Sequence, residues 1–476
     1  MWREWTFPLG ASLPSRGGHT LCPLAHDDSN GLHRSIPEDD DHSLQGGAAL
    51  CLFGGCDAFG IVQETSYVLV VPRRATAGGH VRFRPLSFAG SSSNVRPEGR
   101  TNHAAVSLPP GVQGSSSIVS PSPGTTLPAT ASCAEGGTVV GRFFLFGGCV
   151  YLPTPRLVTS YGVVTISVVQ DHSSPRTRDP APRGGYVAKW EDMSPPGIAT
   201  SPGVAASASA ATVGWSPRPR HSCGAGWVGG SRIAVVGGAD TDGSPLADAC
   251  IFDVASRSWT RVIEFASSLR REMAAALVIR TGGSEMSFGG DDDGHRDGVG
   301  AGREDSWTML MIGGSCQGEA LADAVVVTGA TTDRGQAISL GEHPLLRRVC
   351  HSAVPLSVGG SWALVGGASP LFNDLPVDVK IGVVTRRAQD DHEHVELTST
   401  EPFARQLVCG APPTQTITSC HFGLGQSVAV VAAPQLGGRD PLLATCRSSP
   451  HRVFLGAGLQ PNTATSRFEL FEWIDW

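Results

Sequence analysis

Apolar residues along the chain are concentrated in short runs that end in paired glycines. Each run is long enough for one buried strand, and the glycines let the backbone turn, or approach a neighbour, where a Cβ atom would clash. This pattern recurs along the chain, which indicates a repeated structural unit. The runs are "ALCLFGG" (49–55), "FFLFGG" (143–148), "IAVVGG" (233–238), "MLMIGG" (309–314), "WALVGG" (362–367) and a degenerate sixth copy, "VFLGAG" (453–458).

Each run is followed, after a short polar turn, by a second apolar stretch that predicts the next strand of the same unit. These stretches cover residues 65–71, 159–169, 247–254, 322–327, 374–379 and 465–473. A further strand is clearest in "GYVAKWEDM" (185–193) and "SRSWTRV" (256–262).

A second signature, Arg-x-x-His followed by a small residue, precedes each glycine-ended run. It appears as "RGGHT" (16–20), "RTNHA" (100–104), "RPRHS" (218–222) and "RVCHS" (348–352). The copy at 271–275, "REMAA", has Ala274 in place of histidine, and "TSCHF" (418–422) has Thr418 in place of arginine.

Four short strands per unit, repeated about six times, is the pattern of a β-propeller. The order Arg-x-x-His, glycine pair, third strand and then Trp in the fourth strand resembles the Kelch repeat, over essentially the whole chain outside its insertions. We therefore predict an all-β fold, a single six-bladed Kelch-type β-propeller spanning residues 1–476. In the sixth unit both 428–433 and 453–458 could be the second strand, and the spacing to the third strand favours 453–458.

The two ends of the chain predict how the ring closes. The last unit stops after its third strand, and the N-terminal "MWREWTFPL" reads as an orphan fourth strand. Kelch propellers commonly close by letting one terminus complete the blade begun by the other, which removes a seam of unpaired backbone groups. We expect the N-terminal strand to pair with residues 467–475.

Long low-complexity insertions interrupt the units. Those between first and second strands belong on one face of the disc, whereas the loops between second and third strands are short and belong on the opposite face. Short loops on a rigid scaffold favour partner recognition at that opposite face; the alternative is that the insertions themselves are the interaction segments. The composition of the insertions predicts disorder, at 26–47, 109–140, 194–217, 281–305 and 434–450.

Composition narrows the function classes. The chain has 476 residues, 60 glycines, 34 prolines and only 17% charged residues, which suits many short strands and turns. The net charge of −7 gives no reason to expect nucleic acid or an anionic membrane as partner. The twelve cysteines lack paired CxxC spacing, so we read them as reduced and buried. With no signal-peptide core and no long apolar span, we predict a cytoplasmic protein.

The motif arginines are the main candidate for partner binding. They begin the innermost strands and should stand near one rim of the central channel. In some Kelch domains, arginines at that rim bind acidic peptides through charge-assisted hydrogen bonds; the alternative is that they bond neighbouring carbonyl groups. The recurring histidines, His19, His103, His221, His351 and His421, are predicted to be packing elements. The candidate arginines are Arg16, Arg100, Arg218, Arg271 and Arg348.

Nothing in the sequence specifies catalysis, a metal or a cofactor. The motifs GxxxxGK[ST], GxSxG and HExxH are missing. The charged segments 291–298 and 390–394 are read as solvated loops. We therefore predict a non-catalytic scaffold or adaptor that binds a protein partner, with an acidic peptide segment as one form of it, and that is monomeric alone. The alternatives are a propeller enzyme acting on a small sugar-like substrate and a structural subunit of a large assembly.

Overall fold

A computed structural model gives the structure of part of the chain, and every structural statement below concerns that part. The described residues are 2–6, 16–24, 48–57, 59–71, 82–89, 96–109, 138–169, 185–195, 215–279, 307–329, 335–342, 346–355, 361–365, 367, 380–383, 427–431, 451–460 and 463–473. Apart from the 3₁₀ turn Ser267–Leu269, their regular elements are strands, so the predicted all-β fold is confirmed. None of these residues forms a helix that is long and apolar enough to cross a bilayer.

The strands form antiparallel sheets that follow one another along the chain. The first sheet has the order β2-β3-β4-β5, with bounds Thr20–Leu24, Ala48–Phe53, Tyr67–Val71 and Arg82–Pro85. The second has the order β7-β8-β11-β12, with bounds Ala104–Ser107, Thr138–Phe146, Gly162–Val169 and Gly185–Asp192. Strand β6 (Ser87–Phe88), which follows the first sheet in sequence, pairs in parallel with β12.

The remaining sheets repeat this order. The third is β13-β14-β15-β16, with bounds Gly224–Gly229, Arg232–Val236, Asp248–Asp253 and Ser258–Glu264. The fourth is β17-β18-β21-β22, with bounds Ala275–Ile279, Trp307–Ile312, Asp323–Gly329 and Gln336–Glu342. The fifth is β23-β24-β25, with bounds Ser352–Pro355, Ser361–Val365 and Lys380–Val383.

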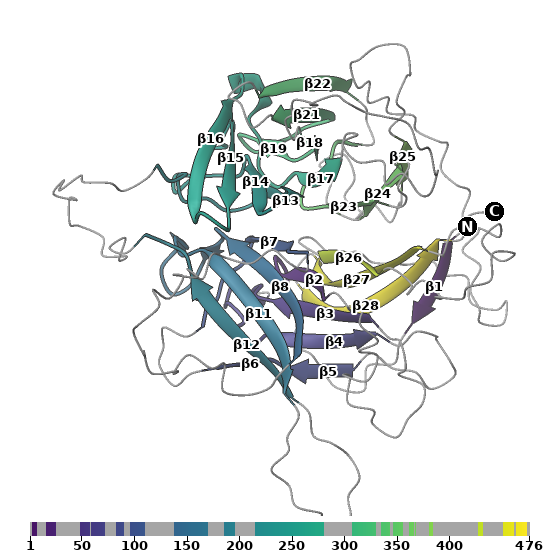
Figure 1. Cartoon of the computed structure of the whole chain (residues 1–476). Coiled ribbons are helices and arrows are strands. Elements are labelled where there is room, and N and C mark those ends of the chain that lie inside the picture. Colours follow the sequence, from purple (N-terminus) through teal and green to yellow (C-terminus); the bar gives the residue numbers. More distant parts are fainter. Residues whose placement is uncertain are drawn as a thin grey trace, which may run out of the picture.

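The sheets are arranged like the blades of a propeller. The first strand of each sheet contacts the first strand of the next, in the order β2, β7, β13, β17 and β23; β26 (Ser427–Val431) then contacts both β23 and β2. Figure 1 shows these strands gathered around the centre, with later strands of each sheet further out.

The termini meet in one further sheet, the closing sheet, as predicted. Strand β1 (Trp2–Thr6) pairs antiparallel with β28 (Thr463–Trp473), and Trp5 lies opposite Leu470. The sheet order is β1-β28-β27-β26, with β27 at His451–Gln460, so "VFLGAG" is the second strand. Figure 1 places both chain ends beside this sheet.

Side-chain alternation explains why the strands before the glycines are apolar throughout. In β8, Phe143 and Leu145 pack toward the first sheet, against residues such as Phe53. Their neighbours Phe144 and Phe146 point the other way and pack against the third sheet. Each such strand is therefore buried on both faces, which removes the polar positions of a half-exposed strand.

Two predicted boundaries are wrong. Residues 138–140, assigned to the insertion 109–140, form the start of β8. The third strand of the fifth sheet is Lys380–Val383, immediately after the predicted segment 374–379, which lies outside the described residues. The insertions at 26–47, 281–305 and 434–450 do lie between first and second strands, and 194–217 between a fourth and a first, although most of their residues lie outside the described part.

The glycine pairs are the points where one sheet is joined to the next. Gly147 and Gly148 follow β8 with φ of +64° and +95°. The N–H of Gly148 donates to the carbonyl oxygen of Arg220 in the third sheet at 2.9 Å, and a Cβ on Gly147 would lie 2.3 Å from that oxygen. The same bond recurs between the first and second, third and fourth, and fourth and fifth sheets: Gly55 to Arg100, Gly238 to Arg271 and Gly314 to Arg348.

Substituting Gly147 by alanine should be strongly destabilising. The new methyl group requires an unfavourable φ and collides with a backbone atom, so we expect a loss of about 3 kcal/mol in the free energy of unfolding. Gly243→Ala is the matched control: Gly243 has φ +72° but nothing within 4 Å of the added Cβ, so the loss should be about 1 kcal/mol. Denaturant titration of both variants measures the difference, and equal losses would contradict the proposed contact.

Candidate functional site

The motif arginines lie inside the protein. Arg16, Arg100, Arg271 and Arg348 are all less than 5% exposed. The guanidinium of Arg100 shows how such a charge is accommodated: it donates to the carbonyl oxygens of Glu98 at 3.0 Å, Gly147 at 3.2 Å and Ser160 at 2.8 Å. Arg100 therefore ties the start of its own sheet to the glycine pair and to the residues before the third strand.

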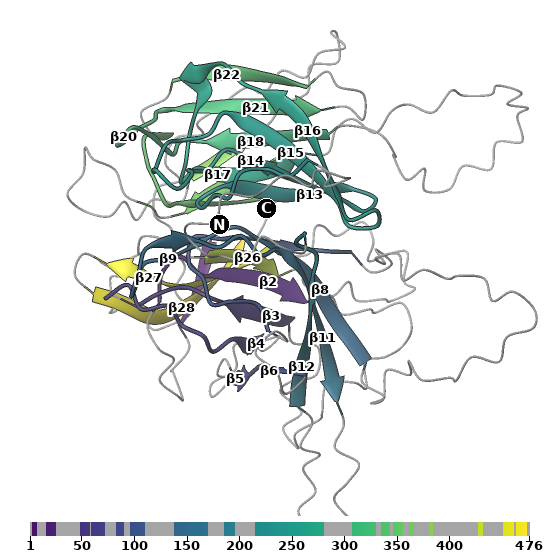
Figure 2. The same ribbon diagram turned by 90° about the vertical axis from the view of Figure 1, so that its left-hand side faces the viewer.

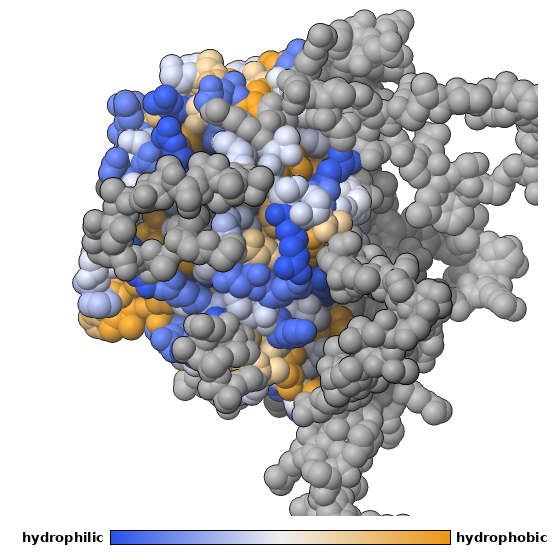
Figure 3. Space-filling model, turned by 60° about the vertical axis from the view of Figure 1, so that its left-hand side comes forward, coloured by the Kyte–Doolittle hydropathy of each residue, from blue (hydrophilic) through white to orange (hydrophobic). Residues whose placement is uncertain are grey.

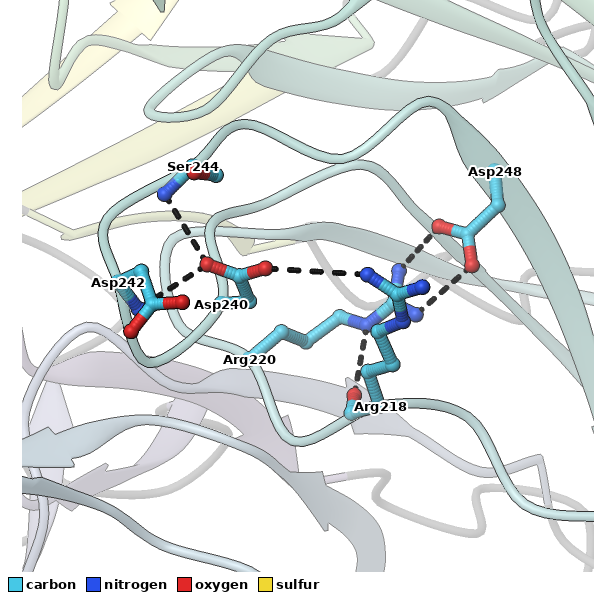
Figure 4. Close-up of polar contacts among 6 residues, drawn as sticks. All are labelled: Arg218, Arg220, Asp240, Asp242, Ser244 and Asp248. Carbon is cyan, nitrogen blue, oxygen red and sulfur yellow. Dashed lines mark hydrogen bonds and ion pairs between the residues drawn. The ribbon is translucent and has the colours of Figure 1, made fainter.

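In the third and fourth sheets the motif arginine binds a carboxylate on the third strand, where Arg100 binds the neutral carbonyl group of Ser160. Arg220 donates to both oxygens of Asp248, at 2.6 and 2.9 Å, and Figure 4 shows this two-point contact. Arg271 binds Asp323 in the same way, at 3.2 and 3.0 Å. Burial opposes the charge on Arg220, but the hydrogen bond and charge of Asp248 outweigh it and raise the pKa of Arg220. For Arg100 burial dominates and lowers the pKa.

The third motif arginine is Arg220, so the assignment of Arg218 is wrong. Arg218 is exposed and makes only a 3.9 Å ion pair with Asp240, also drawn in Figure 4. The structural register explains the error. His103, three residues after Arg100, packs against Gly148, the second glycine of its sheet. Cys223, three residues after Arg220, packs against Gly238 in the same way. "RPRHS" contains the expected spacing, but His221 does not occupy the histidine position.

The burial of these side chains corrects the prediction that they form an accessible partner-binding rim. Arg16, Arg100 and Arg271 donate to acceptors within their own sheets, and Arg348 is 4% exposed. An acidic peptide could not reach these guanidinium groups without breaking the contacts that join the strands. The contacts support the alternative interpretation, in which the arginines bond neighbouring carbonyl groups.

The recurring histidines that stand three residues after a motif arginine are buried packing elements. His19, His103 and His351 are each no more than 6% exposed, and His421 lies outside the described residues. Burial, then Arg348, lowers the pKa of His351 to about 3. Burial, then Arg100 and His19, lowers the pKa of His103 well below its usual value. Both rings are therefore neutral at physiological pH.

A second set of backbone hydrogen bonds also runs from sheet to sheet. The residue two positions after each motif arginine has a positive φ, and from the second sheet to the fifth its N–H donates to the carbonyl oxygen of the equivalent residue in the preceding sheet. These bonds run from Asn102 to Gly18, Ser222 to Asn102, Met273 to Ser222 and Cys350 to Met273, at 2.8 to 3.1 Å. The motif residues thus form a continuous framework and leave the loops beyond them to make the surface.

The loops between second and third strands form one side of the molecule, which we call the short-loop face. We define it by the described residues 54–57, 59–66, 147–161, 237–247 and 313–322. Figure 2 shows β9 (Cys149–Val150) and β20 (Glu319–Ala320), which belong to these loops, on the same side. Two of the loops are organised by a carboxylate: Asp57 accepts the N–H groups of Phe59 and Ile61, and Asp240 those of Asp242 and Ser244.

Four exposed hydrophobic side chains on the short-loop face form what we call the apolar patch: Phe59, Ile61, Tyr151 and Leu152. Their exposed fractions are 81%, 52%, 39% and 48%. Gly60 lies between the first two, and a Cβ on Gly60 would be 3.4 Å from the Cβ of Tyr151, so the two loops touch. Figure 3 shows hydrophobic surface in separate areas bordered by hydrophilic residues. A local group of exposed hydrophobic side chains such as the apolar patch marks a candidate binding site.

The groups beside Tyr151 are poorly suited to nucleophilic chemistry. Burial raises the pKa of Cys149 and of Cys350 to about 11, so both thiols are protonated at neutral pH. Burial also raises the pKa of Tyr151 itself. Across the described ranges, no group of three or more His, Cys, Asp or Glu side chains is placed to hold a metal ion; the charged segments 291–298 and 390–394 lie outside those ranges.

The loop lengths in the sequence predict the short-loop face but not the exposed residues on it. The available signal was "FGI" (59–61), two large apolar side chains around a glycine in a turn that an Asp begins. Neither the comparison with protein-family models nor that with curated proteins gives a match for this chain.

Removing Arg220 should be far more harmful than removing Arg218. Arg220→Ala leaves the Asp248 carboxylate, whose side chain is only 16% exposed, without its cation, which should cost about 3–5 kcal/mol of unfolding free energy. Arg218→Ala removes a side chain that is 75% exposed and should change stability by no more than about 0.5 kcal/mol. Denaturant titration distinguishes the two, and a similar loss for both would contradict the assignment of Arg220 as the motif arginine.

The buried histidines predict a loss of stability in mild acid. Below pH 6.5 the unfolded chain takes up protons that folded His103 and His351 do not, so their contribution is complete above pH 6.5 and falls as the pH decreases. Each histidine adds a slope of up to about 1.4 kcal/mol per pH unit. His351→Ala, which copies Ala274 of the fourth sheet, should flatten the decline between pH 6.5 and 5; parallel stability curves for variant and wild type would contradict this interpretation.

Proposed function

We propose that the chain is a six-bladed Kelch-type propeller that acts as a non-catalytic protein-interaction scaffold in the cytoplasm. The repeated Arg-x-x-His and glycine-pair motifs support the Kelch assignment, and the closed sequence of contacts among β2, β7, β13, β17, β23 and β26 supports six blades. The eight described cysteines are all free thiols, which agrees with a reducing compartment.

The apolar patch is the observation that carries the interaction role. None of the four side chains belongs to the buried clusters between the described sheets. Aromatic residues in such positions are typical of the centres of protein interfaces. The partner is therefore a protein that docks on the short-loop face, while the scaffold alone is a monomer.

Site-specific photo-crosslinking tests this proposal. Only Lys189 and Lys380 are lysines, so amine-reactive reagents cannot report on the short-loop face. Thr154→p-benzoylphenylalanine places a photoreactive group at an exposed position of loop 147–161, and Gln336→p-benzoylphenylalanine places one on the outer strand β22. Irradiation of the intact chain in cells should give a discrete protein adduct at position 154 and none at 336.

Three outcomes would contradict the proposal. An adduct at position 336 alone would favour docking on the outer strands, as in a structural subunit. Adducts only from probes in insertion 26–47 would favour the insertions as interaction segments. The lack of any adduct, combined with turnover of a sugar substrate by the purified chain, would favour the enzyme alternative.

A further inference from the structure

We propose that the apolar patch binds a short, uncharged peptide segment that carries aliphatic or aromatic side chains. This inference rests on the proposed scaffold function and names the chemistry of its partner. It replaces the acidic peptide expected from the motif arginines, because those side chains are buried.

The patch is held in place before any partner arrives. Asp57 Oδ1 accepts the N–H of Phe59 at 2.9 Å and of Ile61 at 3.0 Å, which fixes the turn that presents both side chains. Asn102 Nδ2 donates to the Tyr151 hydroxyl at 2.8 Å, which fixes the ring beside them. A partner therefore loses little affinity to ordering these loops, which is the advantage of a preorganised site.

Four charged side chains at the edge of the patch form two ion pairs. Glu64, close after Ile61, forms an ion pair with Arg96 at 2.6 Å. Arg156, close after Leu152, forms an ion pair with Glu98. The two pairs also lie near each other, since a Cβ on Gly99 would contact Val62 and Glu64. The two pairs cancel in charge, and the Asp57 carboxylate adds one negative charge beside them. Among the described residues the rim therefore offers no unpaired cation to an acidic segment, and an uncharged segment meets no net attraction or repulsion from the two ion pairs.

The size of the patch favours a peptide over a second copy of the chain. The four exposed fractions together equal the surface of about two large side chains, on the order of 400 Å². A stable interface between two folded proteins buries about 800 Å² per partner. A short segment can bury its own apolar side chains on an area of this size, whereas a dimer would need roughly twice as much.

Selection of random linear peptides displayed on phage, with the full chain as target, tests the inference. The enriched peptides should contain several aliphatic or aromatic residues and few charges. Synthetic copies should bind the wild type in fluorescence anisotropy and bind Phe59→Asp at least about tenfold more weakly. Phe59→Ser, which adds no charge beside Asp57, should weaken binding in the same direction. Ile338→Asp is the matched control, because Ile338 is 54% exposed but lies on β22, and its binding should equal that of the wild type.

Several results would overturn the inference. These are enrichment of acidic peptides, equal binding by wild type and both Phe59 variants, or a Phe59-dependent dimer in sedimentation velocity, which would make the occupant a second copy. Different results would contradict the proposed scaffold function and the peptide inference. A photo-adduct at position 154 together with patch-independent peptides would remove only this inference, whereas no adduct at any probe would remove the scaffold function itself.

Discussion

The hydrogen bond from the second glycine of one sheet to the arginine carbonyl of the next is the contact on which the arrangement of the sheets depends. It requires two things at once: a backbone with positive φ and no Cβ at the glycine pair, and an arginine whose main chain is fixed. The arginine side chain meets the second requirement by donating to the glycine carbonyl and third strand of its own sheet. One residue therefore links strands within a sheet through its side chain and links sheets through its backbone.

This double role explains which parts of the repeat are retained and which vary. Each of the first four sheets has one motif arginine and one glycine pair, because the hydrogen bond between sheets needs both residues. The arginines are Arg16, Arg100, Arg220 and Arg271. The residue three positions after the arginine packs against the second glycine, and His103 also makes a 2.8 Å hydrogen bond with Thr20 through its side chain. Histidine, cysteine or alanine can occupy this position, as His103, Cys223 and Ala274 do. The acceptor at the start of the third strand also varies, from the carbonyl of Ser160, just before β11, to the carboxylate of Asp248 in β15.

The sequence predicts the repeated framework well because glycine pairs and continuous apolar runs have direct structural causes. It also predicts the pairing of the N-terminal strand with β28, since a fourth strand was missing at one end and surplus at the other. Residue spacing alone predicts the wrong arginine in the third sheet. Arg218 has the Arg-x-x-His spacing, but Arg220 makes the motif contacts with Gly237 and Asp248. The apolar patch could not be derived, because Phe59 and Tyr151 are brought together only when neighbouring sheets pack.

The contacts of the motif arginines also affect how the short-loop face can bind a partner. Guanidinium groups are strong anion ligands when exposed, but the motif arginines bond acceptors in the interior, and their burial leaves the short-loop face without a ring of motif arginines. Binding must then depend on what the loops themselves present. The loops that follow the glycine pairs start from fixed points, because both glycines are held by hydrogen bonds within and between sheets. Rigid anchoring at both ends allows a few exposed side chains, such as Phe59 and Tyr151, to be held in place with little entropic cost. The framework contacts therefore determine the position of the apolar patch, and the buried motif arginines add no positive charge to it.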